Sequence, residues 1–597
     1  MPKNWAGERK NLIDVAAGRE PADLVIKQGT WVCVQTGELI PETDAAIQGE
    51  RIAYVGSDAS HCIGPGTEII EATGKFIAPG LLDAHMHVES GMVTITEFVR
   101  AVAPHGTTGL FADPHEMANV FGLRGVKLMA DEAALQPIHV WIQVPSCVPS
   151  APGFETPGAQ FGEAEVAEAL TWLGVIGLGE VMDFPGVARG DPKMLAEMAH
   201  TARARRTIGG HYASPELGIP FHVYAAGGAQ DDHEGTRLED AVVRARQGMR
   251  VIMRFGSAWF DVAAQVKAVT ELGLDPRHFL LCTDDAHSAT LVSEGHMDRV
   301  VRHAIQQGVN PMTAFQMATL NVAEHFGVDQ DVGQIAPGRF ADILILRNLE
   351  EVRIEKVIAK GRLLANEKGL VAEMPAYSYP KWSRQSIKIK RLLKPDDFRI
   401  ASNGSGELTA NVIGVIENQA PTKHLRVPVR AVNGEVLADP SRDLAKIALV
   451  ERHKGTGTLQ VGLVQGFGLT AHCAIASSIA HDSHHMIVVG TSEKEMALAA
   501  NEIAAAGGGQ IVVKDGEVIG IVELPIGGLM SDQRAEVVAQ KTDGLLAGFK
   551  ACGCDLNNPN MQLSLLALVV IPELRISDLG LVNVLKGEFI PVLEHAA

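Results

Sequence analysis

The chain has 597 residues, of which 46% are hydrophobic and 21% charged, so it is long enough for roughly two to four folded domains and too apolar to be mainly disordered. Its formal net charge of -19 argues against a broad nucleic-acid or anionic-membrane surface, because either partner favours clustered Lys and Arg. Seven scattered cysteines fit neither a disulfide framework nor a zinc-finger spacing.

No stretch of the sequence has the pattern of a membrane or secretory segment. The first ten residues lack the apolar core of a secretory signal. The most apolar late stretch, 561–571, is well short of the ~20 residues needed to cross a bilayer. We therefore expect a soluble, cytoplasmic protein whose partner is a small molecule and neither a nucleic acid nor a membrane.

Residues 22–75 alternate in the manner of β-strands. Such hairpins cannot form a stable sheet alone, and strand-like runs return at 338–346 and 357–364. We predict a small β-sandwich domain built from residues 1–75 and 333–380, on both flanks of a central domain.

Between residues 76 and 332, short β-branched runs alternate with helical stretches, which is typical of a parallel α/β sheet. Eight predicted strands cover about 250 residues, the usual size of a (β/α)8 barrel. In such a barrel the chemistry lies where the strands end. The predicted strand ends are His85, Asp113, Val144, Glu180, His211, Asp231, Arg254 and Asp284.

A Pro-rich stretch at 144–158 follows the third predicted strand and is too long for a minimal βα turn. We interpret it either as a wall or lid of a pocket or as a rigid surface loop, and the sequence leaves both open.

A third region begins near residue 385, and we predict a C-terminal α+β domain over 385–597. Asp515-Gly516, between two apolar runs, is a strong hairpin signal. Residues 493–506 and 531–549 have helical patterns.

Six side chains at or beside the predicted strand ends are of the types that bind divalent ions. His85 and His87 are two residues apart in a strand, so both can point to one side. Four imidazoles and two carboxylates form a mixed set that is able to hold two divalent ions, with Glu180 as the bridge. The predicted metal ligands are His85, His87, Glu180, His211, His233 and Asp284.

Several motifs resemble the adenine deaminase family of the amidohydrolase superfamily, over nearly the whole chain. The His-x-His element alone identifies only the superfamily, whereas Asp-Pro-His-Glu at 113–116 and the C-terminal motifs are much narrower. The segments that carry the resemblance are 80–93, 113–120, 144–149, 283–285, 475–484 and 528–532.

The resemblance implies hydrolysis of adenine to hypoxanthine and ammonia by a hydroxide that is held between two metal ions and attacks C6. It also implies manganese or iron, of which we favour manganese, while zinc suits the same ligands. Glu180 occupies the position at which many relatives in the superfamily have a carboxylated lysine. Two departures from the family pattern are Phe255, where we expect Glu, and residues 470–472, which replace a more basic stretch.

The roles of the catalytic residues follow from where the protons must go. We predict Asp284 as the general base that takes the hydroxide proton and delivers it to the departing amino group, because a carboxylate at the metal reaches both. The group that protonates ring N1 stays open among Glu89, Glu116, His115 and His287. As a metabolic enzyme, expected in purine salvage, the protein should form a homodimer or a larger homo-oligomer.

Two questions stay open at this point. The cluster His481–His485 is interpreted as a separate metal site, as a pocket wall or subunit contact, or as plain structural polarity. The alternative functions are another amidohydrolase that acts on a related purine or on a cyclic amide or imide, and a non-catalytic scaffold. A deaminase acting on nucleic acid is disfavoured because the P-C-x-x-C part of its H-x-E and P-C-x-x-C pattern is missing from the sequence.

Overall fold

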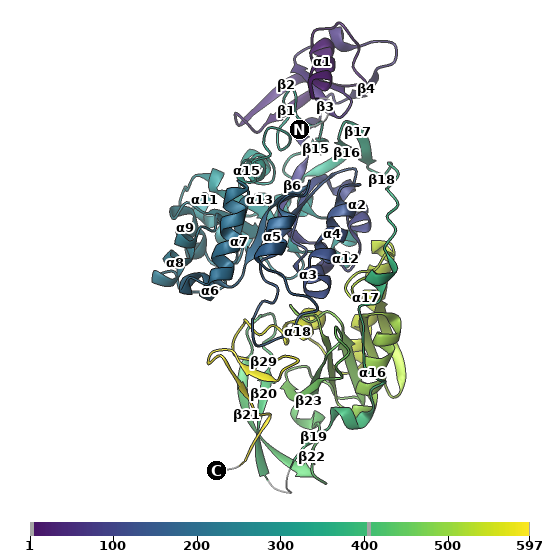
Figure 1. The fold of residues 1–597 in the computed structure, drawn as a ribbon. Coiled ribbons are helices and arrows are strands. Elements are labelled where there is room, and N and C mark those ends of the chain that lie inside the picture. Colours follow the sequence, from purple (N-terminus) through teal and green to yellow (C-terminus); the bar gives the residue numbers. More distant parts are fainter. Residues whose placement is uncertain (1–4, 403–406, 596–597) are drawn as a thin grey trace.

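The computed structural model describes residues 5–402 and 407–595, which form a mixed α/β structure (Figure 1). Helix α1 (Trp5–Ala16) precedes a nine-stranded sheet. Strand β5 pairs antiparallel with β15, so segments from both flanks of the central region share this sheet. Its strands are β1 (Leu24–Cys33), β2 (Glu38–Gln48), β3 (Arg51–Gly56), β4 (Glu68–Glu71), β5 (Phe76–Pro79), β15 (Ile343–Asn348), β16 (Arg353–Ala359), β17 (Arg362–Asn366) and β18 (Gly369–Leu370).

The central region contains two parallel sheets, with the strand orders β10-β9-β8-β7-β6-β14 and β11-β12-β13. Strand β14 follows β13 after a single residue and pairs with β6, which places Asp284 beside Met86 and Asp285 beside His87. The strands are β6 (Leu81–His87), β7 (Thr107–Ala112), β8 (His139–Val144), β9 (Val175–Val181), β10 (Thr207–Gly210), β11 (Asp231–Asp232), β12 (Arg250–Arg254), β13 (Phe279–Cys282) and β14 (Asp284–Asp285).

Helices alternate with these strands along the chain and pack around them (Figure 1). Strands β6, β7 and β9 are buried along their whole length, so their side chains fill the interior on both sides. The helices are α2 (Ile95–Val102), α3 (His115–Phe121), α4 (Leu123–Ala133), α5 (Glu163–Ala169), α6 (Phe184–Arg189), α7 (Pro192–Arg203), α8 (Ile219–Gly227), α9 (Leu238–Arg246), α10 (Val262–Gln265), α11 (Lys267–Thr270), α12 (Ser288–Ser293), α13 (Met297–Gln306), α14 (Pro311–Met317) and α15 (Leu320–His325).

In its described residues, the C-terminal region is built on an eleven-stranded sheet with three α-helices and a small three-stranded sheet, β29–β31. The predicted hairpin is confirmed: Asp515 and Gly516 connect β27 and β28, and both have positive φ angles. The elements are β19 (Ile400–Ala401), β20 (Glu407–Gly414), β21 (Lys423–Val432), β22 (Glu435–Val436), β23 (Leu444–Val450), β24 (Leu459–Gln465), β25 (Cys473–Ser477), β26 (Met486–Gly490), α16 (Glu493–Ala506), β27 (Gly509–Lys514), β28 (Glu517–Glu523), α17 (Ala535–Ala551), α18 (Pro559–Leu565), β29 (Leu574–Ile576), β30 (Leu581–Asn583), β31 (Glu588–Ile590) and β32 (Leu593–His595).

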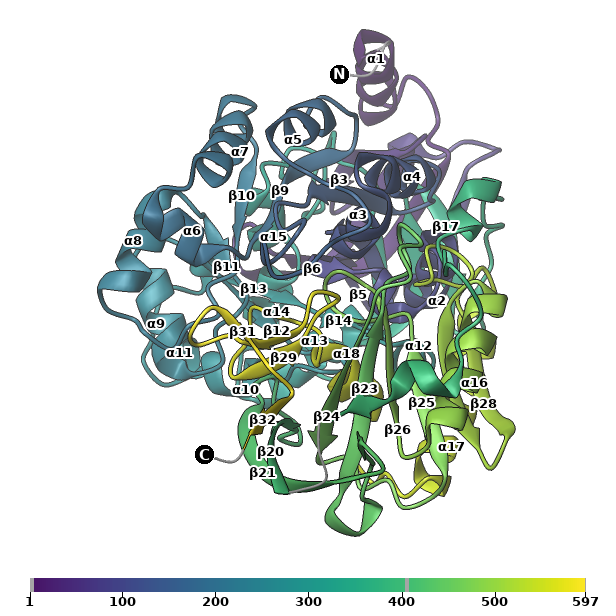
Figure 2. The same cartoon turned by 60° about the horizontal axis from the view of Figure 1, so that its bottom comes forward.

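The C-terminal region packs against the ends of the central strands. Ser531 N donates to Met92 O at 2.9 Å, and Thr94 N donates to Ser531 O at 3.1 Å. One hydrophobic cluster continues from the central strands into the C-terminal sheet, and Figure 2 shows α18 and β29 in front of the central strands. The loops that follow the central strands are therefore covered by the C-terminal region.

All seven cysteines lie in the described part of the chain, where they are buried and free of disulfides. Among the described helices, none is long and apolar enough to cross a membrane.

Candidate metal centre

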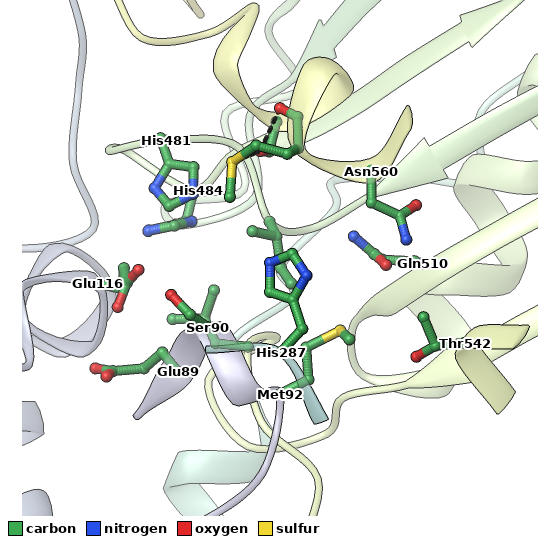
Figure 3. A pocket seen from close by; sticks show the side chains of 14 residues that line it. Glu89, Ser90, Met92, Glu116, His287, His481, His484, Gln510, Thr542 and Asn560 are labelled. Carbon is green, nitrogen blue, oxygen red and sulfur yellow. Dashed lines mark hydrogen bonds between the residues drawn. The ribbon is translucent and has the colours of Figure 1, made fainter. Parts of the chain in front are cut away.

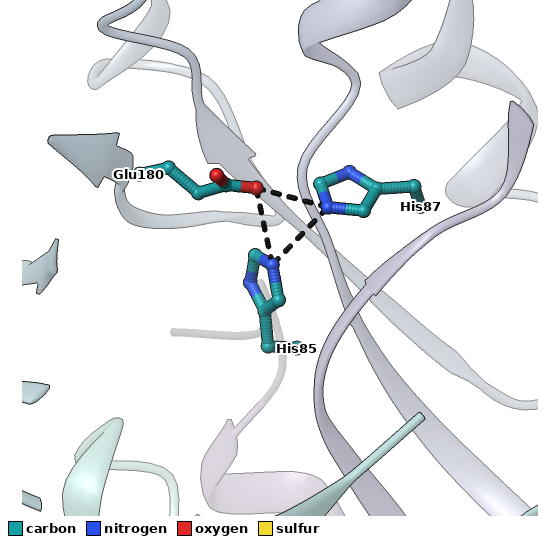
Figure 4. A group of neighbouring side chains, drawn as sticks. All are labelled: His85, His87 and Glu180. Carbon is teal, nitrogen blue, oxygen red and sulfur yellow. Dashed lines mark hydrogen bonds and ion pairs between the residues drawn. The ribbon is translucent and has the colours of Figure 1, made fainter. Parts of the chain in front are cut away.

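Glu180 lies between two pairs of histidines at the end of β9. Its Oε1 is 3.2 Å from His85 Nε2 and 2.9 Å from His87 Nε2 (Figure 4). Its Oε2 is 2.6 Å from His211 Nδ1 and 3.8 Å from His233 Nε2. One carboxylate thus faces two imidazoles with each of its oxygens, and all five side chains are largely buried.

Asp284 is the sixth member of the predicted set, and it lies on the other side of His87. Its Oδ1 is 3.3 Å from His87 Nε2. The pairing of β14 with β6 brings the two residues together from distant parts of the sequence. The structure therefore gathers all six predicted ligands into one cluster.

Backbone groups set the direction of the imidazoles. His87 Nδ1 lies 2.9 Å from the carbonyl oxygen of Asp113, so this nitrogen carries the proton and Nε2 keeps a lone pair for the cluster. The Asp113 carboxylate accepts a hydrogen bond from Glu180 N at 3.0 Å. His211 N donates to the Tyr224 hydroxyl at 2.8 Å, which fixes the strand end that carries this imidazole.

The donor set fits a divalent cation. Among the described residues, the buried atoms Glu180 Oε1 and His211 Nδ1 have no hydrogen-bond partner of good geometry. The Nε2 atoms of His85 and His87 are 3.2 Å apart, so their lone pairs point to the same place. Buried lone pairs that converge without a proton donor are costly unless a cation satisfies them. Imidazole with carboxylate is a common ligand set for zinc, iron and manganese.

The pKa shifts of the groups in and beside the cluster also favour the binding of a positive charge there. Burial lowers the pKa of His211, but the carboxylates of Glu234 and Glu180 outweigh it and raise the pKa to about 9. Burial raises the pKa of Asp113 to about 7, and the negative charge of Glu180 adds to this effect. Excess negative charge in a buried site is what a bound cation neutralises.

Three of the other predicted residues lie around a small cavity of about 60 Å³ beside the cluster (Figure 3). Glu89, Glu116 and His287 line it together with His481 and His484. Burial raises the pKa of both Glu89 and Glu116, and the charge of Glu89 raises that of Glu116 further. The two carboxyls therefore favour a shared proton.

A larger cavity of about 770 Å³ opens onto the cluster around Glu180. Of the residues predicted to move protons, Asp284, Glu116 and His115 line it. The C-terminal region contributes His481 and Asp482, while His484 and His485 are fully buried behind them. Part of the His481–His485 cluster is therefore a pocket wall.

The Pro-rich loop 144–158 is mostly buried and connects the two regions. The Ser146 hydroxyl donates to the carbonyl oxygen of Glu180 at 2.5 Å. Thr156 N donates to Asp578 Oδ1 of the C-terminal region at 3.0 Å. The loop is therefore packed between the two regions and is not a surface loop, but none of its residues is among the described residues that line the two cavities, so its interpretation as a pocket wall or lid stays a prediction.

Sequence reasoning missed Arg254 as a functional residue, although it was placed at a strand end. Its side chain is buried and lies against Asp284 in the larger cavity. The signal was present, because a charged residue at the end of a buried strand needs a partner. Phe255, the departure noted above, stacks on His303 with ring centroids 3.7 Å apart and contacts Arg299, and it is not among the described residues that line the cavity.

The parallel strands and the imidazoles that converge at their ends define an amidohydrolase, and the model of the amidohydrolase family matches residues 76–364. A model of the adenine deaminase C-terminal domain matches residues 419–588. Adenine deaminase 3 of Rhizobium meliloti is 59% identical over 99% of this chain and 100% of its own, and the adenine deaminase of Mesorhizobium japonicum is 58% identical over 98% of this chain and 96% of its own. The chain belongs to the adenine deaminase family. The adenine deaminase of the more distant Moorella thermoacetica is still 48% identical over 98% of both chains.

Proposed function

We propose that the chain removes the 6-amino group of adenine by hydrolysis, giving hypoxanthine and ammonia. The observation that carries the proposal is the relationship over the full chain to proteins named adenine deaminase. The cluster around Glu180 agrees with it, because adenine C6 is a poor electrophile and its hydrolysis needs a strong nucleophile.

We infer that two divalent ions bind at the cluster, and manganese is our choice over iron or zinc. The two oxygens of Glu180 each face a pair of imidazoles, which supports a bridging carboxylate. When bound, such ions would lower the pKa of a water molecule to ~7 and would supply hydroxide at neutral pH. The proposed ligands are His85, His87, Glu180, His211, His233 and Asp284.

Asp284 is proposed to move the proton of the attacking oxygen. Its Oδ1 faces His87 and its Oδ2 accepts a hydrogen bond from Arg254, so the carboxylate is held at the mouth of the cluster. From there it takes the proton as the oxygen adds to C6 and gives it to the departing amino group.

Ring N1 must gain a proton as C6 becomes tetrahedral, and we propose Glu116 as the donor. It lines both the larger cavity and the small cavity that holds Glu89 and His287. Burial raises the pKa of its carboxyl well above the ordinary range, which favours the protonated form that can donate. His115 also lines the larger cavity, but burial and the charge of His87 lower its pKa to about 4, which leaves it neutral. Glu89 and His287 are proposed to support Glu116 from behind.

We propose that the central strands close into a (β/α)8 barrel over residues 76–332, with a β-sandwich domain at 1–75 and 333–380 and a C-terminal domain at 385–597. The β14–β6 pairing supports closure at one seam of the two sheets. At the other seam, Gln230 N donates to Ile208 O at 2.9 Å. A cytoplasmic homo-oligomer that acts on the free base in purine salvage completes the proposal.

The test is to incubate manganese-loaded protein with adenine and to follow ammonia release and the ultraviolet change to hypoxanthine. Turnover by the wild type and its loss in Asp284→Asn are expected. No turnover of adenine by folded, metal-loaded protein would reject the substrate. Cleavage of a cyclic amide such as a hydantoin in its place would favour the other branch of the superfamily.

A further inference from the structure

Asp482 has a buried carboxylate oxygen without a partner in the wall of the larger cavity. Its side chain is 3% exposed, and it lines the cavity from the C-terminal region. Its Oδ1 lies 3.6 Å from His481 Nδ1 and 3.9 Å from His115 Nε2. Its Oδ2 has no hydrogen-bond partner among the described residues. An unpaired carboxylate oxygen at such depth needs a donor that arrives from the cavity.

One side chain, His115, separates the Asp482 carboxylate from the cluster around Glu180. His115 lies between the two sites: its Nδ1 is 3.8 Å from Glu180 Oε1, and its Nε2 faces Asp482. Asp482 is thus one imidazole ring and two contacts away from Glu180. A flat bicyclic base that places C6 at the cluster extends its five-membered ring over the same span.

The walls of the cavity suit the faces of such a base. Met182 and Phe184 line it from the central region, and Met561 and Leu565 line it from the C-terminal region. Apolar walls bind an aromatic ring by its faces, so the few polar groups at the edge decide its orientation.

We propose that Asp482 accepts a hydrogen bond from the N–H of the five-membered ring of adenine, and that it makes the enzyme select the free base. The proposal rests on the proposed function. A nucleoside or a 9-substituted adenine has no such N–H, so its binding leaves the buried carboxylate unpaired. Sites that are built to bind a donor reject analogues without one far more strongly than apolar pockets reject a missing methylene.

The same experiment tests two other roles for Asp482. A third cation could bind to His115, His481 and Asp482, whose ligand atoms lie within 4.8 Å of one another. Alternatively, Asp482 could serve only to join the two regions through His115. At 3.9 Å this contact is longer than a hydrogen bond, so it does not satisfy the carboxylate.

The experiment compares adenine with 9-methyladenine as substrates of the manganese-loaded full chain. We expect the wild type to prefer adenine by about 100-fold or more in kcat/KM. In Asp482→Ala, kcat/KM for adenine should fall by about 10-fold to 100-fold, mainly through KM, and the preference should shrink by a similar factor. Asp482→Asn keeps an acceptor without the charge and should lie between the two.

Asp443→Asn is the matched control, because Asp443 is a half-buried aspartate of the same region that accepts hydrogen bonds from Gly466 N and Gly468 N and does not belong to the described lining of the cavity. Its preference for adenine should equal that of the wild type. Metal per chain, measured by mass spectrometry of the acid-digested protein, should be the same in all variants. If Asp482→Ala does not fold, the Asp482→Asn variant and the binding of hypoxanthine against 9-methylhypoxanthine decide the question.

An unchanged preference in the Asp482 variants, with wild-type adenine turnover, overturns this assignment and leaves the proposed function intact. Loss of one metal ion per chain in those variants also overturns it, in favour of a third cation. If the wild type does not deaminate adenine at all, the proposed function fails and this assignment fails with it.

Discussion

Arg254 Nη1 lies 3.1 Å from Asp284 Oδ2, and this hydrogen bond orients the proposed proton carrier. The guanidinium also contacts Glu234, and its Nε donates to Asp261 Oδ2 at 2.7 Å. Arg254 is buried, and its positive charge faces the negative charges of three carboxylates. Asp284 itself has a φ of 60°, a conformation that is unfavourable for a residue with a side chain and that its neighbours must hold.

Replacing Arg254 should therefore lower the rate of the chemical step more than it lowers the affinity for the substrate. In Arg254→Lys we expect kcat to fall by about 10-fold to 100-fold with little change in KM, because the lysine keeps the charge but not the two-sided contact. Arg254→Ala should also destabilise the fold by about 3–5 kcal/mol, since it leaves buried acids unpaired. Steady-state kinetics and thermal unfolding measure the two effects. A rise in KM alone would contradict a role in orienting Asp284.

Glu180→Gln should weaken metal binding far more than it weakens folding. The neutral amide keeps the shape of the side chain but removes the charge that faces four imidazoles. Metal per chain after dialysis should fall from two to one or fewer, and kcat should fall with it. Glu197→Gln is the control, because Glu197 is a buried glutamate of α7 outside the cluster, and its metal content should not change.

Chelation should lower the thermal unfolding temperature of the wild type, because ligands that bind only the folded state stabilise it by mass action. At a free metal concentration of about 100 times the dissociation constant, the expected contribution is about 2.7 kcal/mol for each independent site. The same chelator should leave the unfolding temperature of metal-free Glu180→Gln unchanged. A wild type that unfolds at the same temperature with and without chelator would argue against resident ions.

Glu116→Gln should lose about 100-fold or more in kcat, because an amide cannot protonate N1. Glu89→Gln should lose less, since Glu89 lines the small cavity behind Glu116. Kinetics of both variants at equal metal content provide the measurement. Equal losses in both variants would point to a shared structural role, and a larger loss for Glu89 would reverse the two roles.

Glu155 should make the stability depend on pH. Burial raises its pKa from the ordinary 4.5 to about 7, while Ser150 and Ala151 N donate to its carboxyl. Between these two pH values the folded chain holds a proton that the unfolded chain releases, so stability falls as the pH rises through this window. Glu155→Gln removes this pH-dependent loss of folding free energy, which can reach about 3 kcal/mol. Thermal unfolding at pH 5 and pH 8 should show a smaller difference in the variant.

The sequence was informative wherever a local period decides which way a side chain points. The side chains that gather around Glu180 could be predicted because parallel strands end at one edge of a sheet, and His85 and His87 needed only the period of two along β6. The predicted helix at 493–506 coincides with α16. The next one begins four residues later than predicted, because Ser531 is held extended by its pairing with Met92.

Residues that act through tertiary contacts could not be found in this way. Arg254 matters because three acids from separate segments of the chain surround it, and Asp482 matters because the C-terminal region packs on the strand ends. Neither contact produces a periodic pattern of residues in the sequence. That the loop 144–158 is packed between two regions and not exposed likewise needed the partners of Ser146 and Thr156.

The backbone pairing of Ser531 with Met92 and Thr94 limits where this enzyme can be truncated or fused to another protein. A chain that stops near residue 380 would keep every proposed metal ligand but would leave the cavity open to bulk water on one side. Fusion partners and affinity tags are better inserted at the exposed hairpin tip around Gly516. Any insertion near residue 531 would separate the central region from the C-terminal region, which together line the larger cavity.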